Sequence, residues 1–330
     1  MGIQIILIAA VFVTLSNLFM RKSIDAGGSS RAFLMIQLFL AFLVAILLNP
    51  VRTAEYAWSG PIAIFGFAGG IFLGAMMAFL GKALEVGPPG LTFAILNSST
   101  VMPAIVMALF FGSKFGYAYN VFHGFGSLFV LVGLFWAGWG VLKVRLMALQ
   151  GQGALTGVSF GTPSGFKIEN KKKWLLFALG AFVFHVAFLV FMQWRSLFLN
   201  AGNIEGLLFS FSPKEAANQW FMPMIFLATA LVQFWIFCRR DRRLPNRKEV
   251  QYGILGGIAH GVGTYFLIWA TEVATPLEQA MIFPIFAVAI IIFCNGWGQW
   301  LYKEKVNWKA NVLCTGGLLV GTIDWQRIFA

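Results

Sequence analysis

Apolar segments about as long as a membrane helix recur along the whole of this 330-residue chain. A helix needs roughly 20 mainly apolar residues to cross a bilayer. Ten segments meet that requirement, and they cover residues 3–20, 31–49, 61–81, 89–111, 118–140, 174–193, 213–238, 252–271, 275–300 and 308–323. Only 11% of the residues are charged, against about 25% in an average soluble domain. The pattern excludes a soluble protein and predicts an all-α integral membrane protein with ten transmembrane helices.

The lysines and arginines gather in alternate connections between these segments. Of the 24 in the chain, 19 lie in the odd-numbered connections. Positively charged loops stay in the cytoplasm, so we expect these connections inside the cell and both chain ends outside. This explains the net charge of +12 without a nucleic-acid partner. It predicts a multi-pass protein of a bacterial-type inner or plasma membrane, surrounded by lipid.

Two capping boxes that contain proline mark the starts of later helices. They span residues 212–215 and 275–278. A serine or threonine followed three residues later by glutamate, with proline between them, is typical of a helix N-terminus. We therefore expect the seventh helix to begin near Pro213 and the ninth near Pro276. Residues 196–211 are too polar to span a bilayer, so we expect them along its interface.

Two stretches, Lys82–Pro103 and Trp269–Pro284, resemble each other. Ala83, Glu85, Val86 and Pro89 match Ala270, Glu272, Val273 and Pro276 at one constant offset. A basic polar linker, residues 141–173, separates five segments in residues 1–140 from five in residues 174–325. Because five is an odd number, the second copy enters the membrane with the opposite orientation. The sequence predicts two five-helix inverted-topology repeats, with a solute site near the bilayer midplane where they meet.

Glutamate, proline and glycine occupy corresponding places in the two halves. A glutamate precedes each of the fourth and ninth segments, Pro103 and Pro284 lie within them, and the fifth and tenth segments are rich in glycine. This arrangement resembles the drug/metabolite transporter (DMT) superfamily, in its EamA-like ten-helix branch. The resemblance implies a small-solute carrier, often driven by a proton or exchange gradient. It also implies that Asn17, in the first segment, contributes to the cavity.

Polar side chains near the middle of the segments are candidates for function, because polar groups in lipid are costly. Asn97, Ser98 and Thr100 lie midway along the fourth segment together with Ser99, and His185 is central in the sixth. Four consecutive residues cover all sides of a helix, so some must face the interior. Hydrogen bonding between helices is the alternative explanation. We predict that Asn97, Ser98, Thr100 and His185 bind the substrate.

His260 is central in the eighth segment and has polar and aromatic neighbours. Thr264 follows four residues later, on the same face of the helix. Tyr265 and Trp269 lie within the next two turns. Small-molecule sites usually combine aromatic walls with a few polar groups. We predict that His260, Thr264, Tyr265 and Trp269 bind the substrate, together with Gln279 of the ninth segment.

Two glutamates at equivalent places in the repeats are candidates for proton coupling. Lys82 precedes Glu85 by three residues and can pair with it, whereas Trp269 stands at the corresponding place before Glu272. Glu272 is therefore expected to lack an ion-pair partner, and an unpaired carboxylate in low-dielectric surroundings favours its protonated form. We predict coupling roles for Glu272, Glu85 and His260, whose imidazole titrates near neutral pH.

The motifs of enzymes and nucleotide-driven pumps do not occur in this sequence. We expect no catalytic residues, no cofactor and no metal ion. The expected function is secondary active transport of a small organic solute by alternating access. The solute would be a metabolite, amino acid, sugar or drug-like molecule, with protons as a second partner. A passive solute or ion channel and a non-transporting membrane scaffold are the alternatives, and we expect a monomer or a homodimer.

Overall fold

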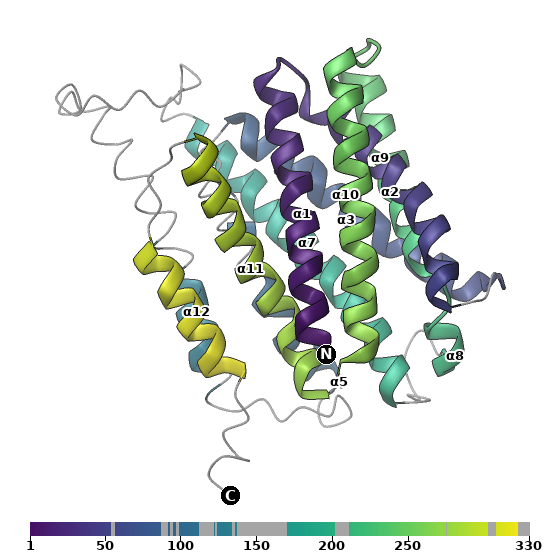
Figure 1. The fold of residues 1–330 in the computed structure, drawn as a ribbon, viewed down its shortest axis with the longest axis vertical. Coiled ribbons are helices and arrows are strands. Elements are labelled where there is room, and N and C mark those ends of the chain that lie inside the picture. The colour runs from purple at the N-terminus through teal and green to yellow at the C-terminus, as the bar shows by residue number, and fades with distance from the viewer. Residues whose placement is uncertain are drawn as a thin grey trace, which may run out of the picture.

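Helices form every regular element in the described part of the chain (Figure 1). The computed structural model describes residues 1–53, 57–86, 92, 95–96, 99–111, 122, 124–133, 136, 170–201, 211–274, 276–302 and 308–322. In chain order the labelled elements are α1 (Gly2–Asp25), α2 (Ser30–Thr53), α3 (Gly60–Val86), η1 (Ser99–Val101), α5 (Met102–Phe111), α7 (Asn170–Ala201), α8 (Pro213–Ala216), α9 (Phe221–Arg240), α10 (Arg247–Val273), α11 (Pro276–Tyr302) and α12 (Trp308–Thr322).

Six of these helices are long and apolar enough to cross a membrane, namely α1, α2, α3, α7, α9 and α10. Two shorter apolar helical stretches, Gly124–Gly133 and Ile285–Leu301, accompany them. Large hydrophobic side chains stay exposed on the outer surfaces of the long helices, as Ile64, Val183 and Trp235 illustrate. A multi-pass membrane protein explains such surfaces, because lipid covers the apolar side chains that water would disfavour.

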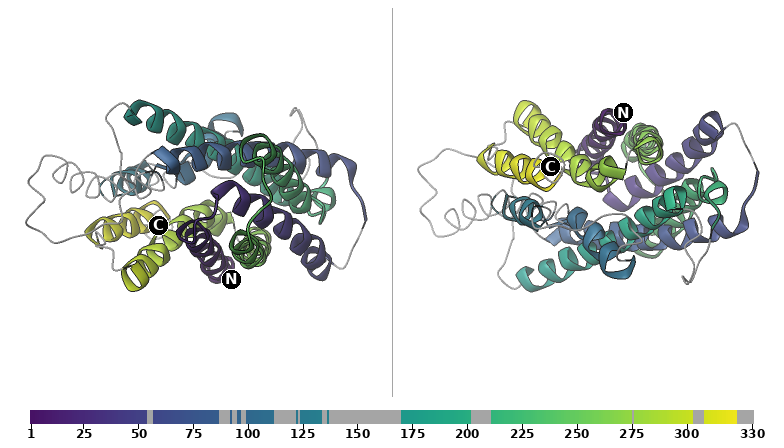
Figure 2. Two further views of the ribbon diagram at one scale, coloured as in Figure 1. Left: turned by 90° about the horizontal axis from the view of Figure 1, so that it is seen from above. Right: turned by 90° about the horizontal axis from the view of Figure 1, so that it is seen from below.

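Eight helical elements follow one another around a closed ring, counting η1 and α5 as one. The order around the ring is α1, α10, α2, α9, α3, α7, η1 with α5, and α11, which packs against α1 again. Seen along the bundle, α2, α10, α1 and α11 form one layer, and α9, α3 and α7 form the other (Figure 2). Neighbours in the ring therefore alternate between the N-terminal and C-terminal parts of the sequence.

The closest helix contacts in the ring occur at glycines. A Cβ atom added to Gly70 of α3 would lie 2.3 Å from the carbonyl oxygen of Ile225 in α9. One added to Gly257 of α10 would lie 2.7 Å from the carbonyl oxygen of Gln37 in α2. Only glycine permits this approach, which is how membrane helices gain packing contacts without a hydrophobic driving force. Thr229 of α9 uses it to donate a 2.9 Å hydrogen bond to the Gly70 carbonyl.

α12 lies outside the ring, packed against α11. It also contacts the helical stretch Gly124–Gly133. A Cβ atom on Gly133 would lie 2.6 Å from the Cys314 Sγ atom, and one on Gly317 would lie 2.8 Å from the Val130 amide nitrogen. These two helical segments thus cover the outside of the ring without contributing to its closed order.

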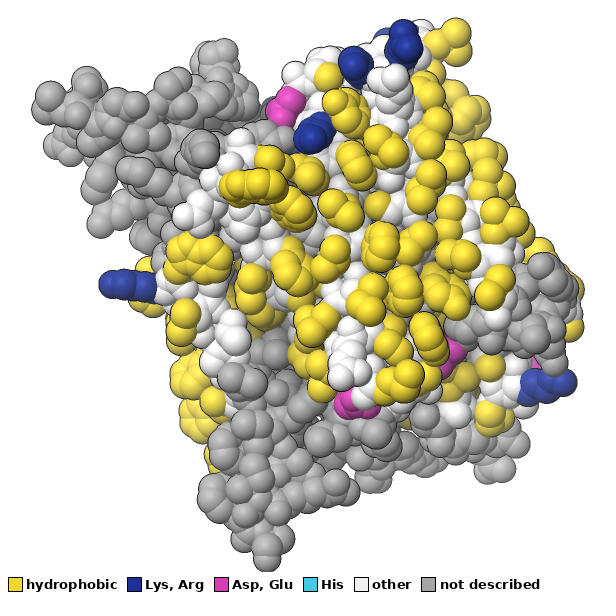
Figure 3. All heavy atoms as spheres, viewed as in Figure 1, with side chains coloured by type: hydrophobic (Ala, Val, Ile, Leu, Met, Phe, Trp, Pro, Cys, Tyr) yellow, Lys and Arg dark blue, Asp and Glu magenta, His cyan; other side chains and the backbone are white. Residues whose placement is uncertain are grey.

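The two ends of the bundle differ in charge. One end, here called the basic end, carries the α1–α2 connection (26–29) and the α9–α10 connection (241–246), and Figure 3 shows Lys and Arg side chains gathered there above a broad hydrophobic face. The opposite end, here called the Met1 end, carries Met1, the α2–α3 connection and α8 (Figure 1). Successive connections between these helices therefore lie at opposite ends of the bundle, as the distribution of basic residues predicts.

Two helix boundaries expected from the sequence are wrong. The Ser212–Glu215 capping box is present, but it begins α8, a helix of only four residues, and the long α9 starts at Phe221. A capping box specifies where a helix starts and not how long it runs. The sixth helix, expected over residues 174–193, extends to Ala201 as α7. The extension places Arg195 inside the helix, buried, instead of in a polar connection.

Candidate functional site

Polar residues on α10 give a scale for depth in the bundle. Glu249 lies in its first turn at the basic end and Glu272 in its last turn at the Met1 end. These two glutamates are 23 positions apart, or about 35 Å at ~1.5 Å per residue, slightly more than the roughly 30 Å of a hydrocarbon core. His260 is 12 residues from Glu272, or about 18 Å, and so lies midway between the ends.

His185 of α7 lies at a similar depth. It precedes Arg195 by ten residues, or about 15 Å, and Arg195 contacts Glu272 at the Met1 end. His185 follows the buried face of α7 that includes Ala178, Ala181 and Leu189. The two histidines therefore approach the same middle layer from different helices.

Ser99 and Leu96 hold the His185 ring. The Ser99 Oγ atom lies 2.6 Å from His185 Nδ1, and the Leu96 carbonyl oxygen lies 3.3 Å from the same nitrogen. Ser99 Oγ also donates to the Leu96 carbonyl at 2.5 Å. These contacts arise where the fourth segment turns from a short 3₁₀ helix, η1, into α5. Irregular backbone at membrane depth is tolerated where it is buried in protein and its polar groups have partners.

The η1 element lies between α7 and α11 in the ring. Ser99 and Thr100, two of its three residues, are buried. The structure therefore brings Thr100 and His185, both predicted to bind substrate, into one region of the ring. Ser99, which makes the contact with His185, is the neighbour that the sequence prediction passed over.

His260 faces the aromatic ring of Phe226 in α9, with ring centroids 5.5 Å apart. Neither nitrogen of its imidazole has a hydrogen-bond partner in the described part of the chain. Thr264, the predicted neighbour on the same face, donates its hydroxyl to the backbone carbonyl of His260 at 2.8 Å. The imidazole is partly buried, so its nitrogens are open to a polar partner at this depth.

The predicted aromatic neighbours of His260 form a separate cluster. Tyr265, Phe266 and Trp269 contact one another, with centroids 5.5–6.2 Å apart, and Phe266 stacks on Phe12 of α1 at 6.0 Å. Nine residues along a helix correspond to a rotation of about 180°. Trp269 therefore lies on the opposite face from His260, and the expected single wall divides into two.

Glu272 has an ion-pair partner, contrary to the sequence prediction. Arg195 Nη2 donates to Glu272 Oε1 at 3.0 Å, and Arg195 Nε donates to the Ala216 carbonyl at 2.7 Å. The guanidinium lies 4.8 Å from the centroid of the Phe221 ring. Only 3% of the Arg195 side chain and 17% of the Glu272 side chain is exposed. The partner escaped prediction because it comes from a helix 77 residues away in sequence and not from the same helix.

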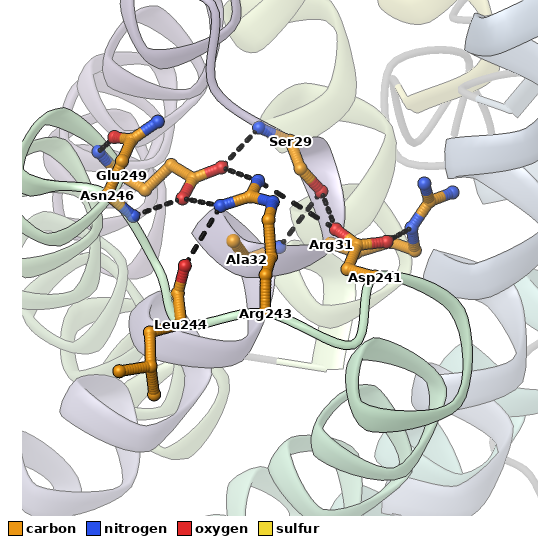
Figure 4. Close-up of polar contacts among 8 residues, drawn as sticks. All are labelled: Ser29, Arg31, Ala32, Asp241, Arg243, Leu244, Asn246 and Glu249. Carbon is orange, nitrogen blue, oxygen red and sulfur yellow. Dashed lines mark hydrogen bonds and ion pairs between the residues drawn. The ribbon is translucent and has the colours of Figure 1, made fainter.

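A larger polar network joins two connections at the basic end (Figure 4). The Ser29 amide donates to Glu249 and its hydroxyl to Asp241, both at 2.6 Å, and Arg31 Nε donates to Asp241 at 2.6 Å. Arg243 donates two hydrogen bonds to Glu249 through its guanidinium, at 2.9 and 2.5 Å. These bonds, foremost those to Glu249, raise the pKa of Arg243 above its ordinary value.

The start of α10 completes this network. Asn246 caps the helix by accepting from the Glu249 amide at 2.8 Å, and the Glu249 carboxylate accepts from the Asn246 amide at 2.6 Å. Glu249 is fully buried. A buried carboxylate that accepts from Ser29, Arg243 and Asn246 joins the α1–α2 connection to α10 more firmly than an exposed ion pair would.

The remaining predicted residues occupy several places. Asn17 of α1 lies with Thr14 beside the Cys294 thiol of α11. Asn97 and Ser98 lie outside the described residues, as do the side chains of Glu85 and Gln279. Glu278, beside Gln279, pairs with the Met1 amino group at 3.1 Å. Within the described ranges, no three His, Cys, Asp or Glu side chains are grouped as a metal site would require.

Comparisons with known proteins bear on the fold alone. No family model matches the chain, and neither does any curated protein. A solved crystal structure, described only as that of a protein, aligns with all of this chain and 99% of its own, with a TM-score of 0.64 and 17% sequence identity. At that identity the likeness shows that the helical arrangement occurs in an experimentally determined protein. It carries no information about substrate.

Proposed function

We propose that this protein is a secondary active transporter of a small organic solute, which moves the solute by alternating access. The observation that carries the proposal is the closed ring in which helices of the two sequence halves alternate. In our proposal the chain has ten transmembrane helices, arranged as inverted repeats over residues 1–140 and 174–325 with a linker over 141–173. Membership of the DMT superfamily, in its EamA-like branch, and a bacterial-type inner membrane belong to the same proposal.

The order of the ring supports the two repeats. With five helices per repeat, α1 corresponds to α7, α2 to α9, α3 to α10, and η1 with α5 to α11. Exchanging each helix for its counterpart converts the α1–α10 contact into the α7–α3 contact, and the α2–α10 contact into the α9–α3 contact. All of these contacts occur. An arrangement that maps onto itself in this way is what an inverted duplication produces.

The glycines at the closest contacts support the same correspondence. Gly66, Gly69, Gly70 and Gly74 of α3 match Gly253, Gly256, Gly257 and Gly261 of α10 at the offset that relates Glu85 to Glu272. Glycines 66, 70 and 74 face α9, and glycines 253, 257 and 261 face α2. The repeat thus extends from the helix ends into the packing surfaces, and this signal was already present in the sequence.

The middle layer of the ring is the proposed solute site. Transporters built from inverted repeats bind their solutes near the midplane, where helices are interrupted. His185, the interrupted helix at η1 and His260 lie at that level, and polar contacts join helices at both ends. Asn17, Asn97, Ser98, Thr264 and Gln279 stay candidates for the same site, while Tyr265 and Trp269 would contribute from the α1 side.

Solute flux in proteoliposomes tests this proposal. The purified protein would be challenged with labelled amino acids, sugars and nucleosides, with empty liposomes as the control. A carrier predicts saturable uptake of at least one class, accelerated by unlabelled solute inside the vesicles. Flux that rises linearly without such acceleration would identify a passive channel, and no flux from any class would favour a scaffold.

Proton coupling through Glu272, Glu85 and His260 is a separate proposal. A pH gradient should drive uptake by the wild-type protein, and Glu272→Gln and His260→Ala should each uncouple it. The Arg195–Glu272 pair gives the proposal a mechanism, because protonation of Glu272 would remove the charge that holds the two helices together at the Met1 end. Unchanged pH-driven uptake in both variants would refute these coupling residues without refuting the carrier.

A further inference from the structure

The hydrogen bonds around His185 determine which of its nitrogens carries the proton. A backbone carbonyl can only accept hydrogen bonds, so Leu96 must receive the hydroxyl hydrogen of Ser99 across their 2.5 Å contact. That hydrogen is then not available to His185. In the 2.6 Å contact between Ser99 Oγ and His185 Nδ1, the histidine must therefore be the donor.

The Leu96 carbonyl gives a second, independent indication. It lies 3.3 Å from the same Nδ1 atom, so Nδ1 faces two oxygen acceptors. A lone pair on Nδ1 would face the lone pairs of the carbonyl, which is unfavourable, whereas an Nδ1–H group satisfies both oxygens. A neutral imidazole has one N–H group, so Nε2 then carries the lone pair.

We infer that Ser99 and Leu96 hold His185 as the Nδ1–H tautomer, and that Nε2 accepts a hydrogen bond from the transported solute. In the described part of the chain no residue hydrogen-bonds to Nε2. His185 lies on the buried face of α7 and is itself incompletely buried. A solute at the midplane would find a neutral acceptor there.

The inference names a class of solute and rests on the proposed carrier function. A fixed acceptor favours solutes that carry an N–H or O–H group, such as primary and secondary amines, amides and alcohols. It disfavours analogues in which methylation has removed every donor, because a buried acceptor would then lose its partner. Ser99 acts as a positioning residue, since it sets the tautomer without contacting the solute.

Nitrogen NMR spectroscopy of the full chain in lipid nanodiscs tests the tautomer without any solute. The chain has three histidines, so ¹⁵N-histidine labelling gives few signals, and the spectrum of His185→Asn identifies those of His185. We expect a proton bonded to Nδ1 and none on Nε2. A proton on Nε2 in the wild-type protein would overturn the inference.

Variants of Ser99 test its positioning role in the same spectrum. Ser99→Ala should give a mixture of the two tautomers, because only the more distant Leu96 carbonyl remains. Ser99→Thr retains the hydroxyl and should give the wild-type signals. A Ser99→Ala spectrum identical to that of the wild type would show that Ser99 does not set the tautomer.

Flux measurements test the role of Nε2 in selecting solutes. His185→Asn retains a donor near Nδ1 and lacks the Nε2 acceptor, whereas the amide oxygen of His185→Gln can reach the Nε2 position. We expect at least a tenfold loss of uptake for His185→Asn and a smaller loss for His185→Gln. Each transported solute would be compared with its fully methylated analogue, which should be taken up at least tenfold less well by the wild type.

The two measurements separate the inference from the function on which it rests. Equal uptake of parent and methylated solutes by the wild type would overturn the selection of donors while leaving the carrier intact. An absence of flux for every solute would refute both the carrier and its selection of donors. The tautomer would still be decided by the NMR spectrum.

Discussion

The two ends of the bundle are held together in different ways. At the basic end, Ser29, Arg31, Asp241, Arg243 and Glu249 form a network that joins two connections. At the Met1 end, Arg195 and Glu272 form an ion pair that joins α7 to α10, and the Met1 amino group pairs with Glu278 of α11. A network spreads the loss of one residue over several bonds, whereas removing one partner of a largely buried ion pair takes away the opposite charge beside the other.

The proposed repeat places this difference at equivalent positions of the two halves. At the offset that aligns the glycines, Ser59 and Ile62 stand where Asn246 and Glu249 start α10. The α3 start thus has a residue able to cap it but lacks the carboxylate that organises the network. The two halves share glycines at their closest helix contacts and differ in the chemistry of their ends. Under the proposed alternating access, we expect the Met1 end to open more readily than the basic end.

The largest effect is expected from breaking the pair at the Met1 end. Arg195→Met removes the guanidinium that pairs with the Glu272 carboxylate and should destabilise the protein by about 3 kcal/mol. Combining it with Glu272→Leu removes both charges and should recover most of that loss. Thermal unfolding in detergent measures both. Arg21→Met, in an exposed pair with Asp25, is the control and should cost about 1 kcal/mol or less.

A smaller effect is expected at the basic end. Glu249→Ala removes the acceptor shared by Ser29, Arg243 and Asn246, but 41% of the Arg243 side chain is exposed and water can solvate it. We expect a loss of about 2 kcal/mol, below that of Arg195→Met. The same unfolding measurement tests the order. A greater loss for Glu249→Ala would show that the basic end depends on one residue as much as the Met1 end does.

The shared packing can be tested at equivalent glycines. Gly70→Ala and Gly257→Ala each place a methyl group against backbone and side chains of the neighbouring helix, and should cost about 1–3 kcal/mol. Gly316→Ala places its new Cβ atom more than 4 Å from the other described residues outside its own turn of helix, and should be neutral or stabilising by up to about 1 kcal/mol. If only one of the two ring glycines resists substitution, the halves are not equivalent in packing.

The smallest effect concerns α8, near the Met1 end. Ser212→Ala removes the α8 cap and should cost about 1 kcal/mol at neutral pH. The Ser212 backbone amide, and after it the Ser212 hydroxyl, donate to the Glu215 carboxylate and lower its pKa. Ser212→Ala removes only the hydroxyl bond, whose contribution is present above the ordinary glutamate pKa and is lost as the pH falls through the lowered value. Wild type and Ser212→Ala should therefore approach each other in stability on acidification, and a constant difference would contradict the role of Glu215.

The sequence predicted much of the framework, because long apolar segments leave few alternatives. The helices α1, α2, α3, α7 and α10 all include the expected apolar segments. Periodicity and composition are local signals, and membrane helices carry them over 20 residues. The predicted start of the seventh helix, near Pro213, lies too early in the sequence. The capping box there begins the short helix α8, and α9 begins at Phe221.

The candidate site was predicted less well, because its contacts join residues distant in sequence. Arg195 and Glu272 are 77 residues apart, and Ser99 and His185 are 86 apart. Neither pair has a spacing that identifies it. The matching glycines of α3 and α10, by contrast, can be identified from the sequence, because they are related by the same residue offset as Glu85 and Glu272.

Alternating access requires the two ends of the bundle to open in turn. Double electron–electron resonance measures the distance between two spin labels, which would be attached at exposed positions in a variant without the three native cysteines. Labels at Asp25 and Lys172 report the basic end. Labels at Lys214 and Val273 report the Met1 end. On addition of a solute that the flux assay identifies, we predict that one distance lengthens while the other shortens. Both distances lengthening together would indicate an open pore and would contradict alternating access.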